Sequence, residues 1–270
     1  MFTLQQIRPV LKALGKTGAI LIGGQAVNLW SERLQRPGEA PWKDSQPFTS
    51  VDVDLLGNQA DVRILGVDLQ AEIEWPTDPA HTPNIAKVHC RHPEIDIDIL
   101  HTANGLNTAD ALHTAVRLKH GDIPLQVLHP VLCVEAKTAN LLTLDQQVVG
   151  RQDEKHLRLS IANCREYLSA PSGGRTAEVL LAWATRLRAH ANTHAGLEIQ
   201  RRYKLRFLDA VPVEKWRLGK PPLSDWAETE APAWTQEVQD KLAMTEDIKD
   251  WVKGLQSKSK PPRSSSQGGD

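Results

Sequence analysis

The strongest constraint on this chain is an acidic, alternating segment at residues 48–57, in which Asp52 and Asp54 stand between apolar residues. An alternation with a period of two is that of a β-strand, so both carboxylates should point to one face while their apolar neighbours are buried on the other. Carboxylates held side by side repel each other, and one is forced to take up a proton. A divalent cation removes the repulsion, and Mg²⁺ or Mn²⁺ accepts such oxygen ligands while leaving room for substrate phosphates. The segment therefore predicts a strand that carries a metal site.

Upstream, residues 18–30 read as a short apolar strand, a turn at Gly23 and Gly24, and a helix. Glycines at a strand-to-helix turn allow backbone N–H groups to approach a phosphate, and the helix N-terminus adds a favourable dipole. The residues that follow, at about 33–47, are rich in Pro and Gly, which is typical of a surface excursion. The sequence thus predicts a phosphate-binding turn ahead of the acidic strand.

Downstream, residues 94–100 repeat the alternating acidic pattern with Asp96 and Asp98, and they form a hairpin with residues 86–90. A third carboxylate from a neighbouring strand would complete a two-metal site, which clamps the attacking and leaving oxygens of a phosphoryl displacement. Asp96 and Asp98 share one strand face, so their spacing does not decide between them. We also expect the first acidic pair to lie near Gly57, at the end of its strand.

The order of these features resembles the DNA-polymerase-β-like (minimal) nucleotidyltransferases. That family places Gly-Gly or Gly-Ser on the helix turn, two Asp on one strand, and a third Asp on the next strand before a final apolar pair. The resemblance implies an α+β fold with a mixed sheet flanked by helices. It also implies Asp98 as the third metal ligand, with Asp96 as the alternative. The segment between Gly24 and Asp52 is about twice as long as in the family, and the excursion at 33–47 accounts for the extra length.

The second half of the chain carries another charged group, on two predicted amphipathic helices at 132–144 and 153–168. In the abortive-infection (AbiEii-like) type IV toxin nucleotidyltransferases, a helical Lys precedes an Arg-x-Asp segment on the next helix, and Lys137 and Arg151-x-Asp153 match that order. Residues 23–30, 47–54 and 129–141 are also similar to uncharacterised bacterial nucleotidyltransferases. The resemblance implies that Lys137 is catalytic, and that the nucleotide is bound by Gly23, Gly24, Ser50, Lys137, Arg151 and Asp153.

The function implied is transfer of a nucleoside monophosphate from a nucleoside triphosphate, such as ATP, to a hydroxyl acceptor. The toxin-like resemblance implies an RNA end, most plausibly of tRNA, as acceptor and a cognate antitoxin as partner. Residues 201–206, with Arg186 and Arg188, offer a basic patch for RNA. One alternative is an adenylyltransferase that acts on a small molecule or a protein. An alternative of another class is a catalytically inactive binding or antitoxin-like module.

Composition narrows the remaining possibilities. A formal net charge of −1 means that any RNA contact needs a local patch of positive charge. The three cysteines are scattered and do not suggest a disulfide framework, so we expect a reducing cytoplasm. His89, Cys90 and His92 lack a second cluster that would complete a zinc site. No apolar run approaches membrane-spanning length, and no membrane partner is expected.

Changes in composition predict three regions in the 270 residues. Residues 1–128 form the α+β catalytic domain, and residues 129–255 form a helical domain that closes the nucleotide cleft. Four of the eight tryptophans fall between Trp216 and Trp251, where we expect them to pack a terminal helical layer. Residues 256–270 are rich in Lys, Pro, Ser and Gly and are predicted to be disordered.

Overall fold

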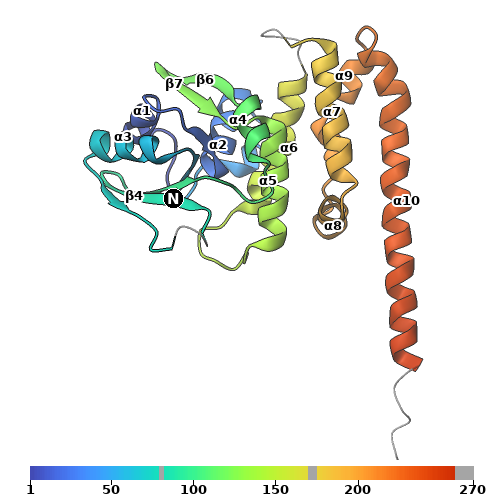
Figure 1. Cartoon of the computed structure of the whole chain (residues 1–270). Helices are drawn as coiled ribbons and strands as arrows, with labels where there is room; N and C mark the ends of the chain where they lie inside the picture. The colour runs from blue at the N-terminus through green and yellow to red at the C-terminus, as the bar shows by residue number, and fades with distance from the viewer. Residues whose placement is uncertain (79–81, 170–174, 259–270) are drawn as a thin grey trace, which may run out of the picture.

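The computed structural model describes residues 1–78, 82–169 and 175–258, with 246–258 described by their backbone alone. Seven strands form one mixed sheet in the first half of the chain, and the second half is helical (Figure 1). The α+β class is confirmed. The strands are β1 (Ile20–Ile22), β2 (Val53–Leu56), β3 (Glu72–Glu74), β4 (Asn84–Arg91), β5 (Glu94–Leu100), β6 (Val116–His120) and β7 (Ile123–Val127). The α-helices are α1 (Arg8–Leu14), α2 (Gly23–Leu34), α3 (Gln59–Leu69), α4 (Thr108–Thr114), α5 (Pro130–Thr143), α6 (Asp153–Leu168), α7 (Ala177–Ala191), α8 (His194–Tyr203), α9 (Val213–Arg217) and α10 (Leu223–Lys258).

The order of strands across the sheet is β3-β4-β5-β2-β1-β7-β6, with β2 near its centre. β2 runs antiparallel to β1 and parallel to β5, and its Asp54 lies opposite Ile22 on one side and Asp98 on the other. Because α2 begins directly after β1, this register brings the N-terminus of α2 to the acidic end of β2. The centre of the sheet therefore joins the glycine turn to both acidic strands.

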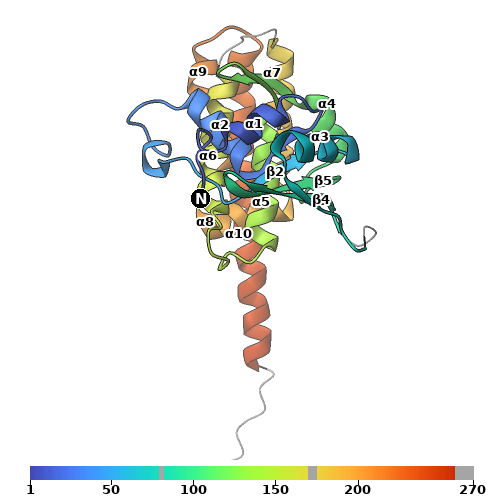
Figure 2. The ribbon, with the colours of Figure 1, turned by 90° about the vertical axis from the view of Figure 1, so that its left-hand side faces the viewer.

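The outer half of the sheet has one apolar and one polar face. Alternate residues of β4 and β5 are buried, among them Val88 and Ile97, and α3 packs along this side (Figure 2). The opposite face carries Lys87, His89, Arg91, Glu94, Asp96 and Asp98, which are half-buried or exposed. This alternation is that of an antiparallel sheet with one face in the core and one toward water.

The excursion after α2 lies mostly at the surface, as predicted for residues 33–47, but it is anchored to the helical half. Trp42 is fully buried, and its indole N–H donates to Asn163 Oδ1 on α6 at 2.9 Å. Arg36 donates to Glu166 on the same helix at 2.7 Å. The anchor was not predicted, because Pro and Gly report turns but not whether a neighbouring side chain is buried. The excursion is thus fixed to the helical half by the contacts of Trp42 and Arg36 with α6.

The helices of the second half build their own core. Buried side chains of α5 to α10 form this second cluster, in which Trp216 and Trp234 are buried. The packing role expected for these two tryptophans is confirmed. α5 and α6 also contribute Leu132, Cys133 and Leu159 to the core of the sheet. Among the described residues, no helix is long and apolar enough to cross a membrane.

Several element boundaries differ from the sequence prediction. Residues 67–74 read in the sequence as a strand or its approach, but residues 67–69 continue α3, and β3 begins only at Glu72. Residues 196–208 read as a helix, whereas α8 ends at Tyr203, because Lys204 adopts a left-handed conformation with φ of 54°. α4 and β6 were not predicted, since their short segments lack a clear apolar period.

The C-terminal tail also begins later than predicted, because α10 runs through residue 256 to Lys258. Residues 170–174, whose Pro and Gly content predicts a break between helices, lie outside the described residues, as does the rest of the tail.

Candidate functional site

The three predicted metal carboxylates come together at the centre of the sheet. Asp52 directly precedes β2, Asp54 is on β2, and Asp98 lies opposite Asp54 on β5. Each offers one oxygen, and these oxygens lie within 4.8 Å of one another. Asp52 and Asp54 were predicted to lie at the end of their strand, near Gly57. They lie instead at its start, because β2 begins only at Val53.

Asp96, the alternative third ligand, lies on the same strand face, but its carboxylate is bonded to residues outside the trio. His89 Nδ1 lies 2.8 Å from Asp96 Oδ1, and Lys87 Nζ lies 3.5 Å from Asp96 Oδ2. In the parallel register it is Asp98, not Asp96, that lies opposite Asp54. The structure therefore groups Asp98 with the first acidic pair and leaves Asp96 in a separate ion-pair network.

The electrostatics of the trio favour binding of a cation. Burial raises the pKa of Asp54 to about 7, and Asp52 and Asp98 push in the same direction while Lys137 opposes them. Burial also raises the pKa of Asp98, against the nearby charge of Lys87. Three carboxylates this close are poorly compatible with full ionisation unless a cation lies between them. An all-oxygen donor set fits Mg²⁺ or Mn²⁺.

The unfolding free energy of the metal-free protein should depend on pH through Asp54. An unfolded Asp releases its proton near pH 4, whereas folded Asp54 keeps its proton up to about pH 7. Protonation of Asp54 therefore stabilises the folded state. This contribution to the unfolding free energy is fully present below pH 4 and is lost as the pH rises through 7, which lowers the unfolding free energy by about 2–4 kcal/mol.

Urea unfolding in a chelator at several pH values measures this effect, with Asp54→Asn as reference. The difference between the two proteins cancels other groups, such as His129 and His156, whose pKa values burial lowers to about 3. A difference that does not change between pH 4 and 8 would contradict the raised pKa.

The glycine turn follows the sequence prediction in position, but the two glycines have different surroundings. Gly23 has a φ of +64°, and a Cβ there would lie 1.9 Å from Asp54 Oδ2, so only glycine fits beside the acidic strand. A Cβ on Gly24 would instead lie 2.4 Å from Ser50 Oγ and 2.9 Å from His156 Cε1. The N-cap residue of α2 is the apolar Ile22, and among the described residues no side-chain cap is found at this helix N-terminus. Gly23 faces the site, and Gly24 allows close packing behind it.

Lys137, Arg151 and Asp153 form one ionic group. Lys137 is only 6% exposed, and its Nζ donates to Asp153 Oδ1 at 3.0 Å. Arg151 donates to Asp153 Oδ2, also at 3.0 Å. Burial opposes ionisation of Asp153, but the charges and hydrogen bonds of Lys137 and Arg151 outweigh it and lower the pKa. Asp153 therefore holds the ammonium of Lys137 in place as a charged group.

Two buried polar residues support the acidic strand from behind. Ser50 Oγ donates to Asp52 Oδ1 at 3.3 Å. His156, on α6 one turn after Asp153, lies with Nε2 3.3 Å from the carbonyl oxygen of Thr49. Burial, aided by the charge of Lys137, lowers the pKa of His156 to about 3, so its imidazole is neutral. The sequence prediction missed His156, because its partner Thr49 is distant in sequence.

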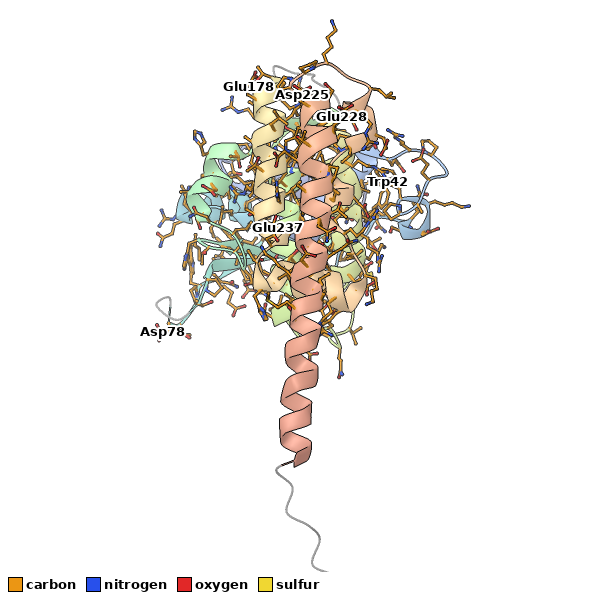
Figure 3. All side chains as sticks on the ribbon, turned by 90° about the vertical axis from the view of Figure 1, so that its right-hand side faces the viewer. Trp42, Asp78, Glu178, Asp225, Glu228 and Glu237 are labelled. Atoms are coloured by element: carbon orange, nitrogen blue, oxygen red, sulfur yellow. The ribbon has the colours of Figure 1, made fainter. Side chains whose placement is uncertain are left out.

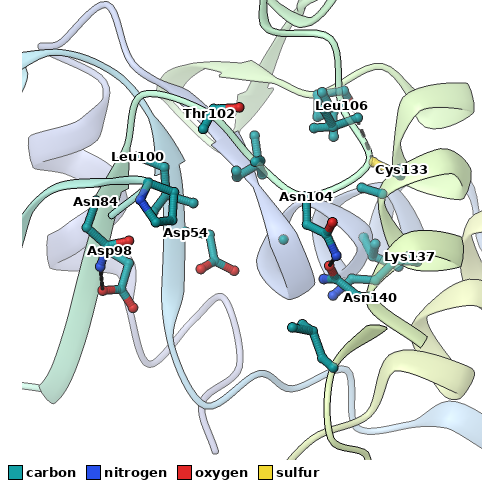
Figure 4. A pocket seen from close by; sticks show the side chains of 18 residues that line it. Asp54, Asn84, Asp98, Leu100, Thr102, Asn104, Leu106, Cys133, Lys137 and Asn140 are labelled. Carbon is teal, nitrogen blue, oxygen red and sulfur yellow. Dashed lines mark hydrogen bonds between the residues drawn. The ribbon is translucent and has the colours of Figure 1, made fainter. Parts of the chain in front are cut away.

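A cavity of about 460 Å³ opens between the acidic trio and α5 (Figure 4). Asp54 and Asp98 line one side together with Asn84, which donates to Asp98 Oδ1 at 3.3 Å. The other side is α5, with Lys137 and Asn140. Much of the remaining wall is apolar, from Ile22, Val27, Leu100, Ala103, Leu106, Leu128, Cys133, Ala136 and Leu144. Gly23 and Lys137 line this cavity, whereas Gly24, Ser50, Arg151 and Asp153 lie outside its lining.

The far end of the cavity is closed by the loop after β5. Asn104 Nδ2 donates to Asn140 Oδ1 at 3.2 Å and to Thr143 Oγ1 at 2.8 Å. Gly105 lies against α5, where a Cβ would meet the Cβ of Ala139 at 2.4 Å. The sequence prediction missed these amides, because Asn104 and α5 are far apart in sequence.

Arg186 and Arg188 are matched by carboxylates and leave the predicted basic patch, whereas residues 201–206 keep an excess of positive charge. Arg186 pairs with Glu135 and Asp110, and Arg188 pairs with Glu230 and Glu237. Arg201 and Arg202 share Glu198, and Arg206 pairs with Asp209. Residues 201–206 themselves carry four positive side chains, including the exposed Lys204, against the two carboxylates of Glu198 and Asp209, so positive charge remains in excess there.

Comparison with known proteins adds little to this geometry. No protein-family model matches the chain, and no curated protein matches it. Among solved structures, the crystal structure of JHP933 from Helicobacter pylori matches at a TM-score of 0.34 and 12% sequence identity. The match covers 92% of this chain and 95% of JHP933. A likeness this weak carries no argument about fold or function.

Proposed function

We propose that the chain is a metal-dependent nucleotidyltransferase that moves a nucleoside monophosphate from a nucleoside triphosphate to a hydroxyl acceptor. The observation that carries the proposal is the trio of Asp52, Asp54 and Asp98, whose carboxylate oxygens lie within 4.8 Å of one another. Two of the three, Asp54 and Asp98, line the cavity beside α5. Gly23 and the buried Lys137 line the same cavity, in the motif order of the nucleotidyltransferases that the sequence resembles.

The three carboxylates would hold Mg²⁺ or Mn²⁺, which when bound supplies positive charge for the phosphoryl transfer. The uncapped N–H groups at the start of α2 face the same end of β2 and bind phosphate oxygens. Lys137 adds a point charge to the triphosphate, and Asp153 orients it. The apolar wall of the cavity takes up the sugar and base and excludes water.

In the reaction the acceptor oxygen attacks the α-phosphorus, the bond to the β-phosphate breaks, and pyrophosphate leaves. The hydroxyl proton passes to Asp98, whose carboxylate lines the cavity beside Asp54. Asn84 and Lys87 both lie at Asp98 Oδ1, at 3.3 and 3.6 Å, and fix the orientation of that carboxylate.

The test is transfer of label from each of four α-phosphate-labelled nucleoside triphosphates, with Mg²⁺, to the RNA or protein of a total cell extract. We expect one nucleotide to label one class of acceptor, and a chelator to abolish the labelling. A protein that neither binds nor turns over any nucleotide in Mg²⁺ would refute the proposal.

Lys137→Met should lower nucleotide affinity about 10- to 100-fold, which corresponds to the loss of one charge-assisted contact of about 1.5–3 kcal/mol. Methionine keeps much of the buried volume, although Asp153 then retains only Arg151 as a charged partner. Calorimetric titration with the nucleotide measures the effect, with the exposed Lys119→Met as matched control. Unchanged affinity and turnover would remove Lys137 from the site.

A further inference from the structure

The acidic trio borders a second cavity on its other side. This groove, of about 820 Å³, is lined by Asp52 and Asp98 and extends over the polar face of β4 and β5. Asp98 lines both cavities, whereas Asp54 lines only the first and Asp52 only the second. The trio therefore lies where a largely apolar cavity meets a largely polar one.

In-line displacement requires these two spaces, and this step rests on the proposed function. The attacking oxygen must approach the phosphorus from the side opposite to the leaving group. Gly23 and Lys137, the proposed contacts of the triphosphate, belong to the first cavity. The acceptor hydroxyl then has to enter from the side of the second cavity.

The register of the hairpin arranges charges across this groove. Lys87 lies opposite Asp98, His89 opposite Asp96, and Arg91 opposite Glu94. Lys87 Nζ lies 3.5–3.6 Å from Asp96 and Asp98, and the two ring nitrogens of His89 lie within 2.9 Å of Asp96 and of Glu74 on β3. The positive groups of β4 thus lie between the acidic side chains of β3 and β5, which already offset their charge.

Negative charge exceeds positive charge in the groove. Its lining holds five carboxylates, those of Asp52, Glu72, Glu94, Asp96 and Asp98. Against them stand the positive charges of Lys87 and Arg91 and, when it is protonated, of His89. A divalent cation at the trio would offset two negative charges, and the phosphates of a bound nucleotide would add more. A polyanion such as RNA meets repulsion here, whereas a positively charged acceptor gains attraction.

We propose that this groove is the acceptor site, and that the acceptor is a hydroxyl compound that carries positive charge close to the hydroxyl. Glu72 and Glu94, both exposed and at a distance from the trio, attract the charged part while the hydroxyl reaches Asp98. A basic segment of a protein and a small polyhydroxylated amine share this chemistry.

The experiment uses the full chain with Mg²⁺ and the labelled nucleotide that it binds. Three acceptors are compared: a serine peptide flanked by lysines, the aminosugar glucosamine, and single-stranded RNA with a free 3′ hydroxyl. The variant Glu72→Lys with Glu94→Lys reverses the charge of the groove, and Glu72→Gln with Glu94→Gln only removes it. The matched control is Glu178→Lys with Glu228→Lys, two exposed positions on the helical half (Figure 3).

We expect label on the peptide or on glucosamine, and the better of the two identifies the source of the charge. The charge-reversed variant should lose at least tenfold in kcat/KM for that acceptor, the glutamine variant should lose less, and the control should lose nothing. Nucleotide affinity should stay unchanged in all of them. Preferential labelling of RNA, or of none of the three while the nucleotide still binds, overturns the acceptor assignment alone. Failure of the wild-type protein to bind nucleotide overturns the proposed function itself.

Discussion

Asp54→Asn should abolish metal-dependent transfer and, in the absence of metal, make the folded protein more stable at pH 8. Loss of a carboxylate that holds the metal removes several kcal/mol of transition-state stabilisation, or roughly three orders of magnitude in rate or more. The same substitution relieves a carboxylate whose pKa is raised to about 7 by burial and by Asp52. The gain in unfolding free energy should be about 1–3 kcal/mol in a chelator, since partial exposure weakens the repulsion.

Label transfer and urea unfolding, measured on one preparation, separate this result from simple misfolding. Asp52→Asn should lose transfer to a similar extent, since its oxygen belongs to the same trio. Asp44→Asn, at an exposed position of the excursion, serves as control and should change neither quantity. A variant of Asp54 that is both active and no more stable than wild type would remove Asp54 from the metal site.

This combination of effects is expected at a functional site. A structural carboxylate is normally ion-paired or hydrogen-bonded, and its removal costs stability. Asp153 is of that kind, since Lys137 and Arg151 bond both of its oxygens. Asp54 instead meets two other carboxylates, and a Cβ on Gly23 would collide with it. The protein tolerates repulsion at Asp54 that it avoids at Asp153.

The parts of the fold that were predictable from the sequence are those with a clear period. The alternation in β4 and β5 predicted the hairpin, and the apolar period of residues 153–168 predicted α6 with its ends. The trio could be proposed because strand periodicity places Asp52 with Asp54, and Asp96 with Asp98, on common faces. Lys87 was not within reach, because a turn at residues 91–93 would set Lys87 opposite Ile97, whereas the actual pairing of Arg91 with Glu94 sets it opposite Asp98.

Other features depend on contacts between distant segments, which no local pattern contains. The parallel register of β2 and β5, which aligns Asp54 with Asp98, is set by the whole sheet. Burial of Trp42 against Asn163 joins residues 121 positions apart. The loss of Arg186 and Arg188 from the predicted basic patch has the same cause, since the carboxylates that pair with them come from α4, α5 and α10.

Asp98→Asn and Asp96→Asn should differ sharply, although the two residues are two positions apart on one strand face. Asp98 contributes an oxygen to the trio, so its loss should remove transfer at every Mg²⁺ concentration tested. Asp96 is bonded to His89 and Lys87, and Lys87 in turn contacts Asp98. Its loss should cost about ten- to a hundredfold and be partly recovered at high Mg²⁺, as for a residue that orients a metal ligand.

The comparison also has a readout that does not depend on turnover. Binding of Mn²⁺, followed by the loss of its free-ion paramagnetic resonance signal, should weaken strongly in Asp98→Asn and only moderately in Asp96→Asn. His89→Gln removes the imidazole that contacts Asp96 and leaves the three carboxylates of the trio unchanged, so it should resemble the Asp96 variant. If Asp98→Asn proves the milder of the two in both Mn²⁺ binding and transfer, Asp96 is the ligand. The carboxylate of Asp96 would then have to leave His89 and Lys87 and move toward Asp52 when the metal binds.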